Sequence, residues 1–230
     1  MQKNIVVTGG SKGIGKAIVE KFLKEGHFVI SISRTIGELN ELIGEYPNQL
    51  DCLFYDFSKK DEVIACSDFI INKYNNINVL VNNAGVFLPG QIGNEEEGVF
   101  ELQMALNISA PYYFTRGLLP LLKQKEYNYI FNICSTASIM GYTNGGSYCI
   151  SKHALLGFSR VLRLELMPYQ TNVCAVIPGA TYTDSWSGSD LPQLRFMKPE
   201  NIAEIIYTTW LNREHACVEE LLIRPLQGDL

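Results

Sequence analysis

Short runs of β-branched and other apolar residues alternate with segments of helical periodicity along almost the whole chain. Alternation of this kind predicts a parallel β-sheet with helices on both faces, because consecutive parallel strands are joined by crossover helices. The 230 residues contain no internal repeat, low-complexity tract or linker, and this length suits one α/β domain. We therefore expect a single doubly wound α/β domain of about seven strands that spans residues 1–230.

The boundaries of the expected elements follow from the period of the apolar residues and from the turn residues between them. The expected strands are Asn4–Val7, Phe28–Ser33, Cys52–Tyr55, Val79–Val81, Tyr129–Ile133, Asn172–Val176 and Leu221–Ile223. The expected helices are Gly13–Lys24, Ile36–Tyr46, Lys60–Tyr74, Glu97–Gln124, Ser147–Met167 and Pro199–Leu211.

A glycine-rich turn, TGGSKGIG, follows the first expected strand and opens the first expected helix. Glycine lets the backbone turn tightly, approach a ligand and pack the helix against the strand. The N–H groups at the start of the helix suit a pyrophosphate, so the turn predicts a Rossmann-type dinucleotide site. Three residues separate Gly9 from Gly13, a spacing that differs from G-x-G-x-x-G. The turn residues expected at the cofactor are Gly9, Ser11, Lys12, Gly13, Ile14 and Gly15.

The end of the second expected strand favours NADP(H) over NAD(H) as the cofactor. Rossmann sites that prefer NAD often have an acid there, which accepts from the ribose hydroxyls. Here Ser33 lies near that position and Arg34 follows it, while Lys12 lies in the glycine turn. Two cations with no acid suit a 2′-phosphate, and arginine binds phosphate through a fork of N–H groups. The alternative is that Arg34 is a solvated charge at the strand end.

Tyr148 and Lys152 stand four residues apart on the expected helix Ser147–Met167, so they share a face. A free tyrosine has a pKa of about 10, and a nearby ammonium lowers it, which suits a general acid–base. Ser135 can hydrogen-bond a substrate oxygen if strand and helix meet there. Such a pair also occurs on ordinary surface helices. Only together with the glycine turn does it indicate a nicotinamide-dependent oxidoreductase.

Several motifs occur in an order that resembles the short-chain dehydrogenase/reductase family, in its compact single-domain branch, over nearly the whole chain. They are TGGSKGIG, YDFS, NNAG, MALNISAP, the Ser135–Tyr148–Lys152 set and PGATYTD. The resemblance implies a catalytic tetrad of Asn107, Ser135, Tyr148 and Lys152. It also implies cofactor contacts by Asp56, Phe57, Asn83, Ala84, Gly85, Tyr148, Lys152, Pro178, Gly179, Thr181 and Thr183.

The resemblance implies an NADP-dependent enzyme that interconverts a small ketone or aldehyde and an alcohol by hydride transfer. Ser135 would hydrogen-bond the carbonyl, and Tyr148 would be the general acid/base. Lys152 would hold the ribose hydroxyls and stabilise the phenolate, and Asn107 would anchor a water. Two alternatives remain open: a non-catalytic NADP-binding redox sensor, or an epimerase or dehydratase on the same fold.

The family pattern is not followed everywhere. Thr181 occupies a position where valine or isoleucine is more frequent, and the carboxyl end lacks the frequent aspartate–glycine–glycine. The stretch 180–198 follows a strand, and such loops line the ligand crevice of an open α/β sheet. We expect it on the substrate side, with Trp186 and Phe196 either covering a substrate or belonging to an ordinary surface loop. These departures prevent the transfer of a particular substrate.

Composition excludes several classes of partner. The net charge is −5 without a basic run, which argues against nucleic acid, and no apolar segment approaches the length of a membrane span. The six cysteines are scattered without metal-ligand spacing, so we expect free thiols, no metal and a cytoplasmic location. The segments Glu97–Gln124 and Ser147–Met167 correspond to helices that pair between subunits in the family, which implies a homodimer or homotetramer.

Overall fold

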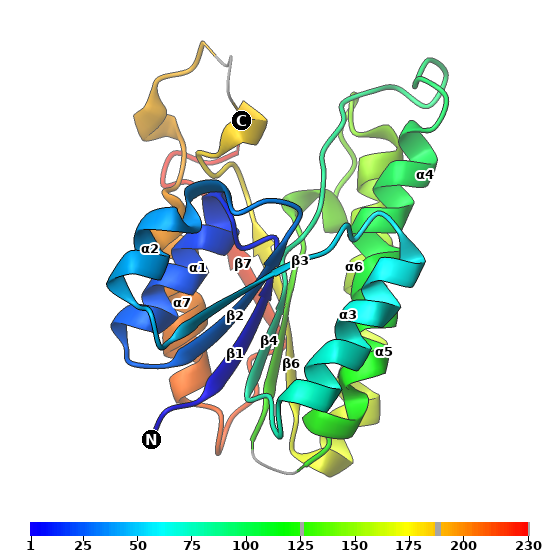
Figure 1. Cartoon of the computed structure of the whole chain (residues 1–230). Helices are drawn as coiled ribbons and strands as arrows, with labels where there is room; N and C mark the ends of the chain where they lie inside the picture. The colour runs from blue at the N-terminus through cyan, green and yellow to red at the C-terminus, as the bar shows by residue number, and fades with distance from the viewer. Residues whose placement is uncertain (125–126, 187–189, 230) are drawn as a thin grey trace.

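The computed structural model describes residues 1–124, 127–186 and 190–229. Its centre is a seven-stranded, wholly parallel sheet with the strand order β3-β2-β1-β4-β5-β6-β7 (Figure 1). The strands are β1 Asn4–Thr8, β2 Phe28–Ser33, β3 Leu50–Phe54, β4 Val79–Asn82, β5 Tyr129–Ile133, β6 Asn172–Pro178 and β7 Glu220–Ile223. The expected fold class is confirmed.

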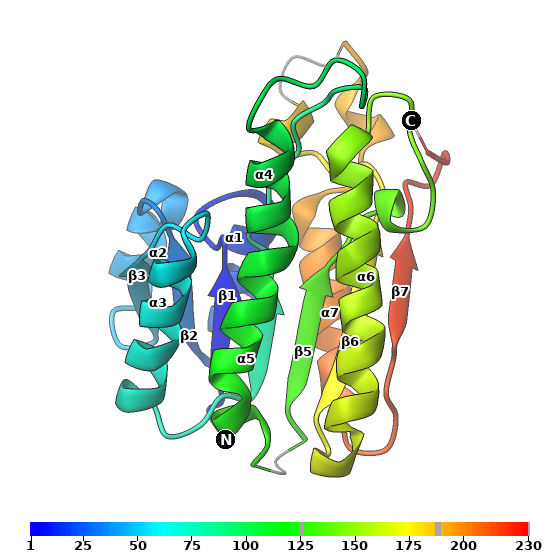
Figure 2. The same cartoon turned by 90° about the vertical axis from the view of Figure 1, so that its right-hand side faces the viewer.

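Helices cover both faces of the sheet, with α1, α2 and α7 on one face and α3, α5 and α6 on the other (Figures 1 and 2). Strand residues alternate between the two layers: Ile5 and Val7 belong to one core cluster and Val6 to the other. The helices are α1 Gly13–Lys24, α2 Asn40–Glu45, α3 Lys60–Lys73, α4 Val99–Met104, α5 Ala110–Leu122, α6 Gly146–Leu166 and α7 Pro199–Leu211.

Two of the expected helices are interrupted. The segment expected as Glu97–Gln124 consists of α4, a π-helical turn over Ala105–Ser109, and α5. The segment expected as Ile36–Tyr46 begins with a 3₁₀ turn over Gly37–Leu39 before α2. Apolar periodicity does not distinguish a single turn of another helix type from α-helix. π-turns occur frequently at functional sites, and this one carries Asn107.

The order of the strands reverses between β1 and β4, which pair through Ile5–Val79 and Val7–Val81. Doubly wound sheets bind ligands at such a switch point, beyond the carboxyl ends of the strands. The loops after β1, β4, β5 and β6 gather at this edge, opposite the amino terminus (Figure 1). Within the described ranges, no helix is both long and apolar enough to cross a membrane.

Candidate active site

The turn between β1 and α1 contains glycines at positions where a side chain does not fit. A Cβ on Gly9 would lie 2.9 Å from the Ala84 Cα, and one on Gly15 would lie 2.1 Å from the Gly9 carbonyl oxygen. Gly9 and Gly13 have φ angles of +66° and +55°, which glycine adopts without strain. The first N–H groups of α1, which begins at Gly13, have no partner within the helix. This cradle therefore fits a pyrophosphate.

Two other predicted turn residues have structural roles as well. The Ser11 carbonyl accepts a hydrogen bond from the Glu38 N–H at 3.0 Å. The Ile14 side chain packs against the core cluster beneath α1. A cofactor contact by Ile14 would therefore come from its backbone.

Thr8, the last residue of β1, joins the glycine turn to the NNAG segment. Its Oγ1 accepts hydrogen bonds from the N–H groups of Asn83 and Ala84, both at 3.0 Å. The Asn83 Nδ2 in turn donates to the carbonyls of Thr8 and Gly9, also at 3.0 Å. These bonds hold the ends of β1 and β4 together at the switch point. Sequence reasoning missed Thr8, although its place directly before the glycines was a usable signal.

The two cations expected near the cofactor have different surroundings. Arg34 is exposed, and the hydroxyl of the preceding Ser33 donates to the Thr35 carbonyl at 2.6 Å. Lys12 instead forms an ion pair with Asp184, with Nζ–Oδ2 at 2.6 Å and both side chains more than 60% exposed. An exposed pair of this kind contributes about 0–1 kcal/mol, so a phosphate can compete for Lys12. Asp184 is 172 residues away in the chain, which is why sequence reasoning did not pair them.

Asp56 follows β3 with its carboxylate held in place. Its Oδ1 accepts hydrogen bonds from the Ser58 N–H at 3.0 Å and the Ser58 hydroxyl at 2.7 Å. Burial would raise the pKa of this carboxyl, but the Ser58 bonds and nearby positive charges outweigh burial and lower the pKa. The neighbouring Phe57 is buried against Phe114, with ring centroids 5.0 Å apart. A cofactor contact by Phe57 would therefore involve its backbone.

Lys152 lies on the second turn of α6 and is only 6% exposed. Its Nζ donates a hydrogen bond to the Ile133 carbonyl at the end of β5, at 2.8 Å. Burial lowers the pKa of the Lys152 ammonium to about 8, because desolvation disfavours the charged form. The same Nζ is 5.8 Å from the centre of the Tyr148 ring. The structure thus brings the predicted pair together at the inner side of α6.

Tyr148 is half-buried, and its ring packs edge-on against Phe87 with centroids 4.8 Å apart. Burial raises the pKa of the Tyr148 phenol to about 12, and a hydrogen bond with Ser135 acts in the opposite direction. The expectation that Lys152 lowers this pKa is therefore wrong for the protein by itself, because desolvation outweighs the other contributions. Tyr148 is a protonated phenol at neutral pH. Ser135 begins a 3₁₀ turn, and its Oγ accepts from the Ala137 N–H at 3.1 Å.

Asn107 is fully buried on the π-turn and uses every polar group of its side chain. Its Oδ1 accepts from the Val86 N–H at 2.9 Å. Its Nδ2 donates to the Val86 carbonyl at 3.0 Å and to the Ser151 hydroxyl at 2.9 Å. A Cβ on Gly85 would lie 2.8 Å from the Asn107 Oδ1 and 3.7 Å from the Lys152 Nζ. A side chain at position 85 would therefore displace the Asn107 carboxamide, while the contact with Lys152 would be an ordinary van der Waals contact.

The segment after β6 lies against the glycine turn. Thr181 is buried, and its Oγ1 donates to the Gly179 carbonyl at 3.1 Å. The Gly179 N–H donates to a β7 carbonyl at 2.7 Å, one residue after Pro178 ends β6. A Cβ on Gly13 would lie 3.2 Å from the Thr183 Cγ2. The PGATYTD segment, whose residues we expect to contact the cofactor, thus reaches the glycine turn through Thr183.

The aromatic residues of the 180–198 stretch pack against one another. The ring of Phe196, which is buried, lies 5.1 Å from the Trp186 ring and 5.7 Å from the Tyr182 ring. Phe196 is therefore an anchor of this stretch, and Trp186 is half-buried beside it. Residues 187–189 of the expected substrate-side loop lie outside the described residues.

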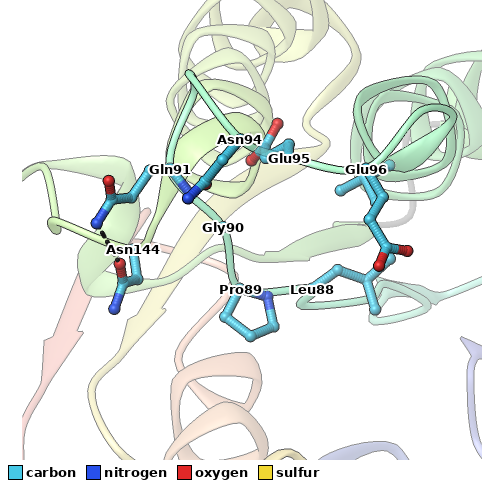
Figure 3. A pocket seen from close by; sticks show the side chains of 9 residues that line it. Leu88, Pro89, Gly90, Gln91, Asn94, Glu95, Glu96 and Asn144 are labelled. Carbon is cyan, nitrogen blue, oxygen red and sulfur yellow. Dashed lines mark hydrogen bonds between the residues drawn. The ribbon is translucent and has the colours of Figure 1, made fainter.

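A cavity of about 540 Å³ opens along the segment that follows β4 (Figure 3). The Gln91 Nε2 donates to the Asn144 Oδ1 across it at 3.3 Å. Leu88, which lines the cavity, directly follows Phe87, the residue whose ring contacts Tyr148. The tetrad side chains do not line it. The lining residues are Leu88, Pro89, Gly90, Gln91, Asn94, Glu95, Glu96, Val99 and Asn144.

Comparison with known proteins decides the family. The short chain dehydrogenase family model matches residues 3–192. The chain belongs to the short-chain dehydrogenase family of oxidoreductases. A sepiapterin reductase of Chlorobaculum tepidum is 30% identical to it and covers 100% of this chain and 99% of its own length. An NADPH-dependent 3-dehydrocapnine reductase of Ornithobacterium rhinotracheale is 36% identical over 79% of this chain and 66% of its own.

The fold of this short-chain dehydrogenase is also similar to solved structures. An alcohol dehydrogenase of the archaeon Thermococcus sibiricus, complexed with 5-hydroxy-NADP, superimposes with a TM-score of 0.90. The two are 25% identical, and the match covers 100% of this chain and 99% of that one. The resemblance inferred from the ordered motifs is confirmed.

Proposed function

We propose that this short-chain dehydrogenase interconverts a small ketone or aldehyde and the corresponding alcohol, with NADP(H) as its cofactor. The observation that supports this most is the convergence of Ser135, Tyr148 and Lys152 beside the glycine cradle. The three come from the turn after β5 and the start of α6, at the carboxyl edge of the sheet, where doubly wound folds bind their ligands.

The residues at the cradle fit a dinucleotide. The glycine turn would hold the pyrophosphate, and Asp56, which keeps its negative charge, would accept from the adenine amino group. Backbone groups of Asn83 to Gly85 and of Pro178 to Thr183 would border the nicotinamide half. When bound, the nicotinamide supplies or accepts the hydride, and the protein's task is to orient the substrate and move the proton.

The proton is handled by the chain's own residues. In reduction, the Ser135 hydroxyl donates to the substrate oxygen and the Tyr148 hydroxyl gives that oxygen its proton. The Lys152 ammonium would favour the phenolate that forms, and water would return a proton to Tyr148. A water held by Asn107 would bind its backbone, because its side-chain groups are bonded to Val86 and Ser151. A pKa of about 12 keeps Tyr148 protonated before the reaction. The role of Lys152 is therefore greatest once the proton has left.

The preference for NADP(H) is supported by charge and by the relatives. Arg34 is exposed at the end of β2, where its guanidinium can reach a 2′-phosphate. Lys12 would exchange Asp184 for the phosphate. The 3-dehydrocapnine reductase is NADPH-dependent by name, and the archaeal alcohol dehydrogenase holds 5-hydroxy-NADP.

The chain as a whole would act as one cofactor-binding domain, residues 1–230, with the 180–198 stretch on the substrate side. Its partner would be a small molecule, and we propose a homodimer or homotetramer. All six cysteines are free thiols, which suits a reducing cytoplasm.

The direct test is oxidation of NADPH, with NADH in parallel, across a panel of carbonyl compounds. The panel includes sepiapterin and 3-dehydrocapnine, because the names of the two relatives give these compounds as their substrates. We expect turnover with at least one class and a higher kcat/KM for NADPH. If the protein binds NADPH but turns over no member of the panel, it is a binding protein and the proposal is wrong.

A further inference from the structure

Gln103 lies one helical turn before Asn107 and makes the same set of hydrogen bonds. It is fully buried. Its Oε1 accepts from the Leu88 N–H at 3.1 Å, and its Nε2 donates to the Leu88 carbonyl at 3.3 Å and to the Ser147 hydroxyl at 2.7 Å. Asn107 bonds Val86 in the same way. Two side-chain amides on α4 and the π-turn therefore hold alternate residues of the segment after β4.

Each amide also reaches a serine directly before a tetrad residue on α6. Asn107 donates to Ser151, which precedes Lys152, and Gln103 donates to Ser147, which precedes Tyr148. The two serines are four residues apart, like the two amides, so the bonds form two parallel rungs between the helices. We call the Asn107–Ser151 bond the lower rung and the Gln103–Ser147 bond the upper rung. The lower rung supports Lys152, and the upper rung supports Tyr148.

Glu95 completes the upper rung. Its Oε1 accepts from the Ser147 N–H at 2.7 Å and from the Ser147 hydroxyl at 2.9 Å. The Ser147 hydroxyl thus accepts from Gln103 and donates to Glu95, which uses both of its functions. A carboxylate at the first turn of α6 is also favourable for the helix dipole. A Cβ on Gly146 would lie 1.9 Å from this oxygen, so a side chain at position 146 would displace the Glu95 carboxylate.

Phe87 lies between the two residues that the amides hold. Because Val86 and Leu88 are each bonded through both N–H and C=O, the backbone on either side of Phe87 is fixed. Its ring packs edge-on against Tyr148 at 4.8 Å. Gln103 therefore reaches Tyr148 from two sides: through Ser147 on the same helix and through Phe87 against its ring.

We propose that Gln103 is a positioning residue for Tyr148, acting through Ser147 and Phe87; this rests on the proposed role of Tyr148 as proton donor. A buried amide with a purely structural role needs hydrogen-bond partners, but these can lie anywhere in the fold. The bonds of Gln103 instead go to Ser147, which precedes Tyr148, and to Leu88, which follows the Phe87 that contacts the Tyr148 ring. Its loss is expected to release the Phe87 ring and the first turn of α6 while leaving the glycine cradle intact.

The test observes Tyr148 directly by NMR, in full-length protein whose tyrosines carry ¹³C at the ring ε positions. The Tyr148 signal is assigned by its absence in Tyr148→Phe, and Phe87→Leu sets the shift for complete loss of the ring contact. In Gln103→Leu we expect the Tyr148 signal to move by at least half of that shift. Ser147→Ala is expected to move it in the same direction, and Ser147→Thr, which keeps the hydroxyl, to restore it.

Asn128→Leu is the matched control. Asn128 is another fully buried amide, which donates to the Leu122 carbonyl at 3.1 Å at the opposite end of the sheet. Its loss should lower stability without moving the Tyr148 signal. An unmoved Tyr148 signal in Gln103→Leu, or an equal movement in Asn128→Leu, would overturn the proposal. If Gln103→Leu does not fold, Ser147→Ala decides on the same criterion.

Kinetics give a second readout. We expect kcat of Gln103→Leu to fall about tenfold or more while the Kd for NADPH stays within twofold. The double variant Gln103→Leu/Ser147→Ala should lose no more than the single variant, because the two act as one unit. Additive losses would contradict this. A wild-type protein without carbonyl turnover would refute the proposed function alone, and the NMR signal would still decide the role of Gln103.

Discussion

Burial shifts the pKa values of the two ionisable residues of the proposed catalytic pair, Tyr148 and Lys152. Lys152 is buried and carries a pKa of about 8, whereas the Tyr148 phenol carries one of about 12. Both shifts have the same first cause, since desolvation disfavours the phenolate as it disfavours the ammonium. Burial therefore sets the direction of both pKa shifts.

The pKa of Lys152 predicts a pH dependence of carbonyl reduction. Because this pKa is lowered to about 8, the ammonium is lost as pH rises through that value, and the phenolate of Tyr148 then loses its support. We expect kcat at saturating NADPH to fall above pH 8, measured from pH 6 to 10. Lys152→Arg, which stays charged, should show a lower but flatter profile. A wild-type rate that is constant across this range would contradict the role of the ammonium.

Arg34 is the residue on which the cofactor preference depends most. It is exposed at the end of β2, while Lys12 is shared with Asp184. In Arg34→Glu the new carboxylate repels a 2′-phosphate and can accept from ribose hydroxyls, so the NADPH/NADH ratio of kcat/KM should fall by about 10²-fold, or roughly 3 kcal/mol. Arg116→Glu on α5 is the charge-matched control. An unchanged ratio in Arg34→Glu would refute the cofactor argument.

At the scale of elements, the sequence predicts what local pattern determines. Each of the seven expected strands is present with its bounds within two residues of the expected ones, and α1 and α7 match their expected bounds, because β-branched runs and helical periodicity are local signals. The π-turn at Asn107 was missed, since one extra residue in a turn leaves the apolar pattern almost unchanged. The rung between Gln103 and Ser147 was also missed. A buried glutamine and a serine 44 residues apart are identified as partners only when α4 and α6 are seen side by side.

The packing of α1 against α7 carries a pH-dependent contribution to stability. The ring of His27, which lies just after α1, packs edge-on against Trp210 of α7, with the ring centroids 5.0 Å apart. Burial, followed by the positive amino terminus, lowers the pKa of His27, while the unfolded chain keeps the ordinary value of about 6.5. The folded state therefore binds fewer protons, and the free energy of unfolding should fall as pH drops below about 6.5.

Urea unfolding at pH 7.5 and 5.5, followed by tryptophan fluorescence, measures this contribution. The loss of stability on acidification should be smaller in His27→Phe than in the wild type, by up to about 1 kcal/mol. His215→Phe, at an exposed position, should behave like the wild type. Equal pH dependence in all three proteins would show that His27 titrates in the folded state as it does in the unfolded chain.

At the scale of the whole molecule, large apolar side chains remain on the outer surface of α6. Val161 is 57% exposed and Leu164 is 67% exposed, so this surface is the one that we expect a second copy of the chain to cover in the proposed homo-oligomer. We expect sedimentation at micromolar concentration to show a dimer or tetramer, and Leu164→Glu to shift it toward the monomer. Leu211→Glu, at a similarly exposed position on α7, should leave the assembly unchanged. A monomeric wild type would contradict this expectation.

The proposed carbonyl reduction depends on the Tyr148 hydroxyl as its proton donor. Tyr148→Phe removes only the hydroxyl, leaving the ring contact with Phe87 and the glycine cradle in place. The measurement is single-turnover NADPH oxidation with the best carbonyl of the panel, beside the Kd for NADPH from its fluorescence. We expect an unchanged Kd for NADPH and a rate lower by about 10²–10⁴-fold. A rate close to that of the wild type, with NADPH bound, would contradict it.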